Sequence, residues 1–224
     1  MNPAKKIIIL GTGGTSVDIL DIINDINDNN KDRNKEEKLE CIGFLDDDET
    51  KIGKSINNVA IIGLLRKAKD FKDAYFISGI GSPTSFLNKE KIISKVDIAF
   101  ERFITLIHPT ASISKSATVG LGSTIFQNVI LGSNVKVGKH VVILPNSVIS
   151  HDDQVGDYAC IAGCVYISGA VSIGRACYIG GSSSIKESLS VGDNSLVGMG
   201  SVVINNIPSK SVYAGNPAKF IRGL

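Results

Sequence analysis

The chain has 224 residues, 43% of them hydrophobic, and a formal net charge of +2, which allows one large domain or two smaller ones. It contains no run of five or six basic residues, so nucleic acid and anionic membranes are not expected as partners. The first ten residues hold neither a signal-peptide core nor a membrane span. We therefore expect a cytoplasmic protein that acts on small molecules.

The charges divide the chain near Leu106. Residues 1–107 carry 16 Lys and Arg and 17 Asp and Glu, whereas residues 108–224 carry only 8 and 5. We therefore predict two domains with these bounds. The four cysteines form no C-x-x-C pair, so we expect reduced, packed thiols and no metal site.

The first domain opens with a strand, a Gly-rich turn and a helix. Residues 5–10 are predicted to form the strand, residues 11–16 the turn, and residues 17–26 an amphipathic helix. In that order, N–H groups at the start of the helix can bind a phosphate, and glycine permits its close approach. The candidate phosphate-binding residues are Gly11, Gly13, Gly14 and Thr15. The polar residues 27–38 are expected to form a loop.

Two further strands are predicted, over residues 40–45 and 74–80. In an open parallel sheet, ligands bind beyond the carboxyl ends of the strands. The residues that follow these strands are Asp46, Asp47, Gly81 and Ser82, and we expect them to bind the substrate. We therefore predict an α/β, Rossmann-like domain that binds a nucleotide. A solvated acidic turn is the alternative interpretation of the aspartates, and a dehydrogenase is disfavoured because no second mononucleotide-binding half is visible.

The second half has a period of six. From Ile113 to Val203, every sixth residue is Ile, Leu or Val. Glycine often follows this residue directly, and small or apolar residues stand four positions after it. A period of six keeps one face of a strand but would rotate around a helix. We therefore predict an all-β parallel β-helix, in which the aliphatic residue and the residue four positions later point inward and glycine makes the bend.

The repeat, the junction over residues 106–113 (LIHPTASI) and the closing segment over residues 207–219 (IPSKSVYAGNPAK) resemble the hexapeptide-repeat nucleotide-amino-sugar acetyltransferases of the PglD and NeuD type. The resemblance covers nearly the whole chain. It implies a left-handed β-helix, a homotrimer, acetyl-CoA bound between neighbouring helices, and a nucleotide sugar held by the first domain. The implied reaction is acetyl transfer to the amino group of a nucleotide-linked 4-amino-dideoxy sugar in surface-glycan biosynthesis. O-acetylation of the sialic acid type remains open.

His151 is the candidate general base. Acyl transfer to an amine needs a base, donors for the developing oxyanion and tight positioning. His151 stands two residues after the inward Ile149, at a bend where the side chain points outward. The resemblance assigns Asp152 to orient its imidazole. Asp153 is the rival partner, although it occupies an inward position, where a carboxylate would need a partner of its own.

The other two histidines have different expected roles. His140 is expected on a solvated bend, because it follows Lys139, and His108 is expected to be a structural or substrate-edge residue. A γ-type carbonic anhydrase would share the β-helix but needs three zinc-binding histidines, two of them five residues apart. Spacings of 32 and 11 residues do not fit that pattern.

The resemblance also implies a site for acetyl-CoA. Its residues would be Cys160, Gly169, Gly181, Met199 and Lys219, with Lys219 at the nucleotide phosphate. The chain departs from the family pattern twice: Cys160 replaces a second histidine, and Leu144 replaces an asparagine. The acyl acceptor and the acyl chain, acetyl or longer, therefore remain open.

Overall fold

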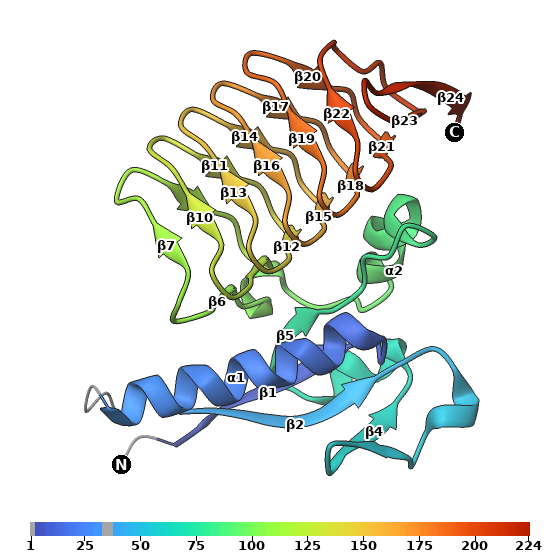
Figure 1. The fold of residues 1–224 in the computed structure, drawn as a ribbon. Helices are drawn as coiled ribbons and strands as arrows, with labels where there is room; N and C mark the ends of the chain where they lie inside the picture. The colour runs from blue at the N-terminus through green and yellow to red at the C-terminus, as the bar shows by residue number, and fades with distance from the viewer. Residues whose placement is uncertain (1–2, 33–37) are drawn as a thin grey trace.

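A computed structural model describes residues 3–32 and 38–224 as an α/β domain with a β-helix stacked on it (Figure 1). The α/β domain has one sheet in the order β3-β4-β2-β1-β5, in which only β3 runs antiparallel to its neighbour. Its strands are β1 (Lys5–Leu10), β2 (Leu39–Leu45), β3 (Ser55–Ile56), β4 (Val59–Gly63) and β5 (Tyr75–Ser78). Its helices are α1 (Gly14–Asp32), η1 (Glu49–Lys51), η2 (Leu65–Asp70), η3 (Phe86–Asn88), α2 (Lys89–Ser94) and η4 (Phe100–Arg102).

Strand β1 is buried on both faces, as its unbroken run of aliphatic residues requires. Ile7 and Ile9 belong to the core that contains the apolar residues of α1. Ile8 and Leu10 belong to a second core, on the other face, with residues of η2 and α2. The sheet is therefore covered on both sides, and only its edges and strand ends reach solvent.

Helix α1 is longer than predicted. It starts at Gly14, inside the Gly-rich turn, and runs to Asp32 rather than ending at residue 26. The polar composition of residues 27–32 wrongly indicated a loop. The side-chain amide of Asn27 binds both backbone groups of Leu39, at 2.8 Å each, and so ties this part of α1 to β2. Residues 33–37 of the predicted loop lie outside the described residues.

The predicted parallel β-helix is confirmed. Residues six apart move to the next face, and residues 18 apart stack and pair in parallel. The strands are β6 (Leu106–Ile107), β7 (Ser112–Ile113), β8 (Thr118–Val119), β9 (Thr124–Ile125), β10 (Ile130–Leu131), β11 (Lys136–Val137), β12 (Val142–Ile143), β13 (Val148–Ile149), β14 (Gln154–Val155), β15 (Cys160–Ile161), β16 (Tyr166–Ile167), β17 (Ser172–Ile173), β18 (Tyr178–Ile179), β19 (Ser184–Ile185), β20 (Ser190–Val191), β21 (Leu196–Val197), β22 (Val202–Val203), β23 (Ser211–Ala214) and β24 (Lys219–Gly223).

The β-helix has three faces. The domain-facing sheet contains β6, β9, β12, β15, β18, β21, β23 and β24 and lies toward the α/β domain (Figure 1). We name the other two by their outward side chains: the apolar sheet contains β7, β10, β13, β16, β19 and β22, and the polar sheet contains β8, β11, β14, β17 and β20. In every strand from β9 to β22 the second residue is the aliphatic one and is buried.

The bend does not lie at the glycine that follows the aliphatic residue, as the sequence had suggested. The positive φ falls two residues later, for example at Asn134 (φ 61) and Asp152 (φ 63), and short polar side chains tolerate this conformation. The glycines instead allow the backbones of adjacent coils to pack closely, because they have no side chain. A Cβ atom on Gly156 would lie 2.6 Å from the carbonyl carbon of Gly174 in the next coil.

The two domains share a buried aromatic contact around His140. Its ring centroid lies 4.6 Å from that of Phe103 and 5.6 Å from that of Phe100, and it stacks on Tyr158 of the next coil at 5.2 Å. His140 is therefore buried, and the prediction of a solvated bend is wrong. The α/β domain covers a corner that would be exposed in an isolated β-helix.

Polar contacts complete the junction between the domains. The carboxylate of Glu90 pairs with Arg175, whose guanidinium lies 4.7 Å from the ring centroid of Tyr158. Nε2 of His108 lies 2.9 Å from Oδ2 of Asp25 in α1, so His108 joins the start of the β-helix to the first domain. No helix in the described part of the chain combines the length and the apolar character needed to cross a membrane.

We predict that protonation of His140 weakens the fold. Burial, followed by the nearby Lys89 cation, lowers the pKa of His140 to about 4. The folded state thus binds fewer protons at His140 than the unfolded state does between about pH 6.5 and 4, so the contribution of His140 to stability should fall by roughly 3 kcal/mol as the pH drops through that range. Because Asp153 also titrates in this range, urea denaturation at several pH values should show this loss as the difference between wild type and a variant without His140.

The matched variant is His140→Asn, because asparagine fills the same bend position at Asn128, Asn134 and Asn146. The variant should start less stable, since it loses ring contacts, but should lose about 3 kcal/mol less between pH 6.5 and 4. Parallel pH profiles for the two proteins would contradict the prediction.

Candidate functional site

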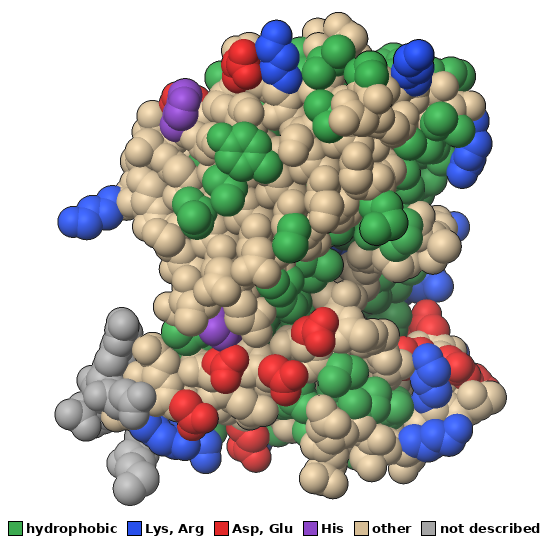
Figure 2. Space-filling view, viewed as in Figure 1, with side chains coloured by type: hydrophobic (Ala, Val, Ile, Leu, Met, Phe, Trp, Pro, Cys, Tyr) green, Lys and Arg blue, Asp and Glu red, His purple; other side chains and the backbone are tan. Residues whose placement is uncertain are grey.

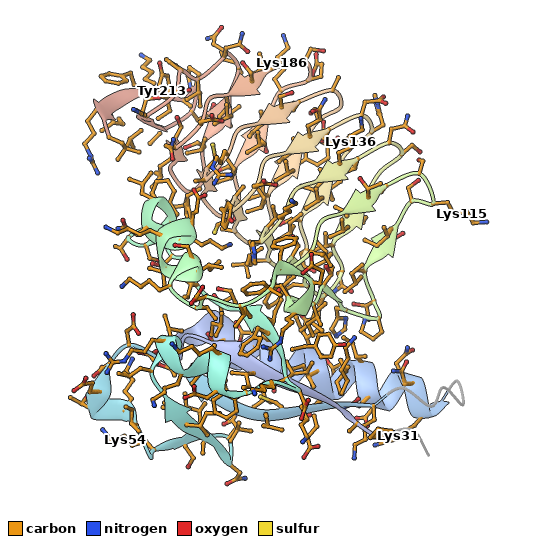
Figure 3. The ribbon with its side chains drawn as sticks, turned by 180° about the vertical axis from the view of Figure 1, so that it is seen from behind. Lys31, Lys54, Lys115, Lys136, Lys186 and Tyr213 are labelled. Atoms are coloured by element: carbon orange, nitrogen blue, oxygen red, sulfur yellow. The ribbon has the colours of Figure 1, made fainter. Side chains whose placement is uncertain are left out.

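His151 lies on an exposed edge of the β-helix, in the turn between β13 and β14, where the apolar sheet meets the polar sheet. The residues in the same place of successive coils are Lys115, Ser133, His151, Gly169 and Glu187, and we call this line the His151 edge. Figure 3 labels Lys115, at one end of this line, and Lys186, which directly precedes Glu187 at the other end. The side chain of His151 is 68% exposed, so the imidazole is accessible to a ligand.

Asp152 orients the imidazole of His151. Nδ1 of His151 lies 2.8 Å from Oδ2 of Asp152, and Oδ1 of Asp152 accepts a hydrogen bond of 2.9 Å from Nδ2 of Asn134. The bond from Asn134, followed by that from His151, lowers the pKa of Asp152. Asp152 is therefore ionised at neutral pH and favours the tautomer with the proton on Nδ1, which leaves Nε2 free to accept a proton.

Gly169 stacks directly on His151, one coil further along. A Cβ atom on Gly169 would lie 2.5 Å from both Cε1 and Nε2 of the imidazole. No larger residue fits there without displacing the ring, and the missing side chain leaves the backbone of Gly169 uncovered beside Nε2.

Asp153, the rival acid, points into the β-helix. It is buried, and its Oδ1 accepts a hydrogen bond of 2.7 Å from the N–H of Val171. Burial raises the pKa of Asp153 to about 7. The structure thus pairs His151 with Asp152, and Asp153 interacts with the backbone of the next coil.

The predicted substrate-binding residues of the first domain surround the carboxyl ends of β1, β2 and β5. Strand β1 connects to β2 on one side and lies beside β5 on the other, so the strand order reverses at β1 and β5, where open α/β sheets form a crevice. The Gly-rich turn and the Gly81–Ser82 segment both follow strands at that point. A Cβ atom on Gly13 or Gly14 would meet nothing within 4 Å, so the turn has free space in front of it.

The two aspartates after β2 diverge. Asp46 accepts a hydrogen bond from Thr12 in the Gly-rich turn and pairs with Lys51 at 3.6 Å. Asp47 pairs instead with Lys95, after α2, at 3.6 Å. Only Asp46 is thus in direct contact with the Gly-rich turn.

Two residues of the site were missed by sequence reasoning. Lys51 donates a 3.0 Å hydrogen bond to Thr12 and so adds a cation beside the Gly-rich turn. Asn134 supports Asp152 from the previous coil. The signal for Asn134 was its spacing of 18 residues from Asp152, because 18 residues make one coil. Lys51 follows the three aspartates, but its direction could not be read from the sequence.

The predicted acetyl-CoA residues are divided among three places. Gly169 is on the His151 edge, whereas Gly181 and Met199 lie on the opposite edge of the apolar sheet, where Met199 is 81% exposed. Lys219 lies in β24 and is exposed. Cys160 is buried against the α/β domain, and its thiol contacts Lys89. Its position therefore does not support contact with acetyl-CoA.

The three histidines lie in separate surroundings. His151 is on an exposed edge, His140 is in the aromatic junction between the domains, and His108 is bonded to Asp25 of α1. Within residues 3–32 and 38–224, no group of three or more His, Cys, Asp or Glu side chains is arranged to hold a metal ion.

Comparisons with known proteins place this geometry in context. The family described as the GMPPB C-terminal domain matches residues 105–217, which is half of the chain. No curated protein matches the chain. Several solved structures share the fold over almost its full length.

The acetyltransferase domain of PglB from Neisseria gonorrhoeae FA1090, solved with acetyl coenzyme A, has a TM-score of 0.81 and 22% identity, covering 98% of this chain and 100% of that one. PerB from Caulobacter crescentus, solved with CoA and GDP-perosamine, has a TM-score of 0.81 and 19% identity, with 97% of each chain covered. WeeI from Acinetobacter baumannii AYE has a TM-score of 0.79 and 23% identity, covering 98% and 100%. At these identities the likeness establishes a shared fold.

Proposed function

The chain belongs to the GMPPB C-terminal domain family, and from that premise we propose that it is an acetyl-CoA-dependent N-acetyltransferase. Its substrate would be a nucleotide-linked amino sugar, such as a 4-amino-dideoxy sugar used in surface-glycan synthesis. One observation carries the proposal: an exposed His151, oriented by Asp152, lies on an edge of a β-helix. The fold is also similar, over both domains, to that of PglB and PerB, of which PerB was solved with GDP-perosamine and CoA.

In this mechanism His151 is the general base. A protonated amine cannot attack a carbonyl carbon, so a proton must be removed as the new bond forms. Nε2 of His151 takes this proton, because Nδ1 is held by Asp152. The ionised Asp152 then stabilises the imidazolium that results.

Acetyl-CoA supplies the activated acetyl group. The His151 edge fits such a ligand, because Gly169 leaves its backbone uncovered beside Nε2. Gly181, Met199 and Lys219 are the further proposed contacts. Since Gly181 and Met199 lie on the other edge of the apolar sheet, one chain does not bring all of these residues together.

A homotrimer would bring them together. The apolar sheet exposes Ile130 (45%) and Tyr166 (49%), and Val148 and Val202 are partly exposed beside them. Figure 2 shows apolar side chains on this face of the β-helix, with the charged groups mainly at its margins and on the α/β domain. The polar sheet has Lys136, Gln154 and Ser172 in the equivalent places. A neighbour covering the apolar sheet could place its Gly181 and Met199 beside His151. Such a contact joins two unlike surfaces, and it closes into a ring when the rotation between subunits is one third of a turn.

The first domain is proposed to be the Rossmann-like nucleotide-binding part. Helix α1 begins inside the Gly-rich turn, and its first N–H groups can bind a phosphate. Free space in front of Gly13 and Gly14, and the Lys51 cation beside Thr12, support this assignment. Thr15, Asp46, Asp47, Gly81 and Ser82 are the further proposed contacts. We also infer a left-handed winding of the β-helix.

The proposal predicts that His151→Ala lowers kcat by roughly 10²- to 10⁴-fold, the usual contribution of a positioned general base, with little change in the KM for acetyl-CoA. Asp152→Asn should have a smaller effect, because it disturbs orientation but leaves the base. The matched control is Lys115→Ala, at the same place on the His151 edge two coils away. A folded His151→Ala variant that keeps more than about a tenth of wild-type kcat would rule out this role.

Gly13→Val should raise the KM for the nucleotide sugar, because the new side chain fills the space in front of the turn and blocks the approach of a phosphate. The KM for acetyl-CoA serves as the internal control and should not change. If both KM values stay at wild type, the nucleotide binds elsewhere.

Tyr166→Glu should convert a trimer into monomers, because it places a charge on the apolar sheet, which the neighbouring subunit would cover. Light scattering at micromolar protein reports the mass. The control is Gln154→Glu on the polar sheet, which should remain trimeric. A wild-type protein with a monomeric mass would contradict the trimer itself.

A further inference from the structure

The inward residues four positions after each aliphatic residue form a column along the β-helix, and the serines in it join adjacent coils. Oγ of Ser123 accepts a 2.9 Å hydrogen bond from the N–H of Val141 and donates a 2.8 Å bond to the carbonyl of Gly138. Oγ of Ser147 repeats this with the N–H of Val165 and the carbonyl of Ala162. Each hydroxyl thus accepts from the residue 18 positions later and donates to the residue 15 positions later.

Two other polar residues of the column, Cys177 and Ser183, keep the second half of this rule, whereas Ser195 and Ser201 donate to the carbonyls of Pro208, 13 residues later, and Gly198, three residues earlier. Sγ of Cys177 donates to the carbonyl of Gly192 at 3.2 Å, and Oγ of Ser183 donates to that of Gly198 at 3.0 Å, again 15 residues later. A polar side chain at these positions of the column therefore lies beside a backbone carbonyl. It can bind that carbonyl only if it carries a hydrogen to donate.

Asp153 occupies this column directly after the His151–Asp152 pair. Its Oδ1 accepts from the N–H of Val171, 18 residues later, as the serines do. By the same register, the carbonyl that faces it is that of Ser168. A carboxylate has no proton to give, whereas a carboxylic acid can satisfy both groups. Among the described residues, Oδ2 of Asp153 has no hydrogen-bond partner, and an ionised oxygen in that place would be buried and unpaired.

We propose that Asp153 keeps its proton in the folded protein up to near-neutral pH, that the neutral acid joins the His151 turn to the next coil through Val171 and Ser168, and that it thereby acts as a positioning residue for His151. Its two partners flank Gly169, on which the imidazole packs. The protonated state of Asp153 is independent of the proposed acetyltransferase activity, and only the positioning role rests on that activity.

The electrostatic surroundings of Asp153 are simple. His151 and Asp152 of its own turn are the charged or titratable groups that act on it. The turns packed against it, residues 132–135 (GSNV) and 168–171 (SGAV), contain no titratable side chain. Burial raises the pKa of Asp153 to about 7, although backbone hydrogen bonds with Val171 and Ser150 act to lower it, so ionisation falls near neutral pH and would break the bond to the Ser168 carbonyl.

The first test measures stability against pH for wild type and Asp153→Asn. An asparagine accepts from Val171 and donates to Ser168 at every pH, so it imitates the neutral acid. The folded wild type holds a proton that the unfolded chain releases near pH 3.9. The unfolding constant of wild type should therefore rise, relative to the variant, by roughly tenfold per pH unit between pH 4 and 7, and the ratio should level off above 7. A ratio that is constant with pH would overturn the proposal.

The second test separates positioning from structure. In Asp153→Asn, kcat should match wild type below pH 7 and should lack the decline that wild type shows as Asp153 ionises. Asp153→Val, which imitates the apolar Val135 and Val171 of the same column, should lower kcat severalfold without changing the KM for acetyl-CoA. Wild-type kcat and pH profile in both variants would overturn the positioning role. Absence of any acetyl transfer by wild type would instead overturn the proposed function and leave the stability test in force.

Discussion

The stacking of residues 18 positions apart determines the architecture of the β-helix, which makes up the second half of the chain. Each two-residue strand pairs only with the strands one coil before and after it, as β13 does with β10 and β16, so no turn of the chain is stable alone. The bends add to the same ladder, because the N–H of Asp152 binds the carbonyl of Ser133 and that of Ala170 binds the carbonyl of His151. Any residue on the surface is thus fixed relative to its neighbours above and below.

In the proposed active site, the contacts that the His151 turn makes with Asn134, Gly169 and Val171 of the adjacent coils use this spacing. Asn134, one coil before, holds Asp152, and Gly169, one coil after, receives the imidazole. Val171 holds Asp153 from inside. Three consecutive residues therefore have three different partners, each in an adjacent coil. His151, the proposed base, projects from a rigid edge, which would favour accurate positioning of a reacting amine.

The features that depend on the six-residue period could be predicted from the sequence. The features that depend on contacts between different domains or secondary-structure elements could not. The β-helix, the outward direction of His151 and the inward direction of Asp153 all follow from counting residues. His140 was misplaced because its position in the coil is a bend, whereas its burial comes from Phe100 and Phe103, which belong to the other domain. The length of α1 was missed because Asn27 binds the backbone of Leu39, a contact that polar composition does not reveal. The contact of the Cys160 thiol with Lys89 was not foreseen, because the outward direction of Cys160 on β15 leads into the domain junction.

The most direct measurement is acetyl transfer by purified wild-type protein to a panel of UDP-, GDP- and dTDP-linked amino sugars, each paired with the corresponding hydroxyl sugar. Free thiol released from acetyl-CoA and the mass of the acetylated sugar would be recorded together. We predict thiol release that matches N-acetylated product for at least one amino sugar, and none with its hydroxyl counterpart. Transfer to a hydroxyl sugar alone, or no transfer to any amino sugar by folded protein, would contradict the assignment as an N-acetyltransferase.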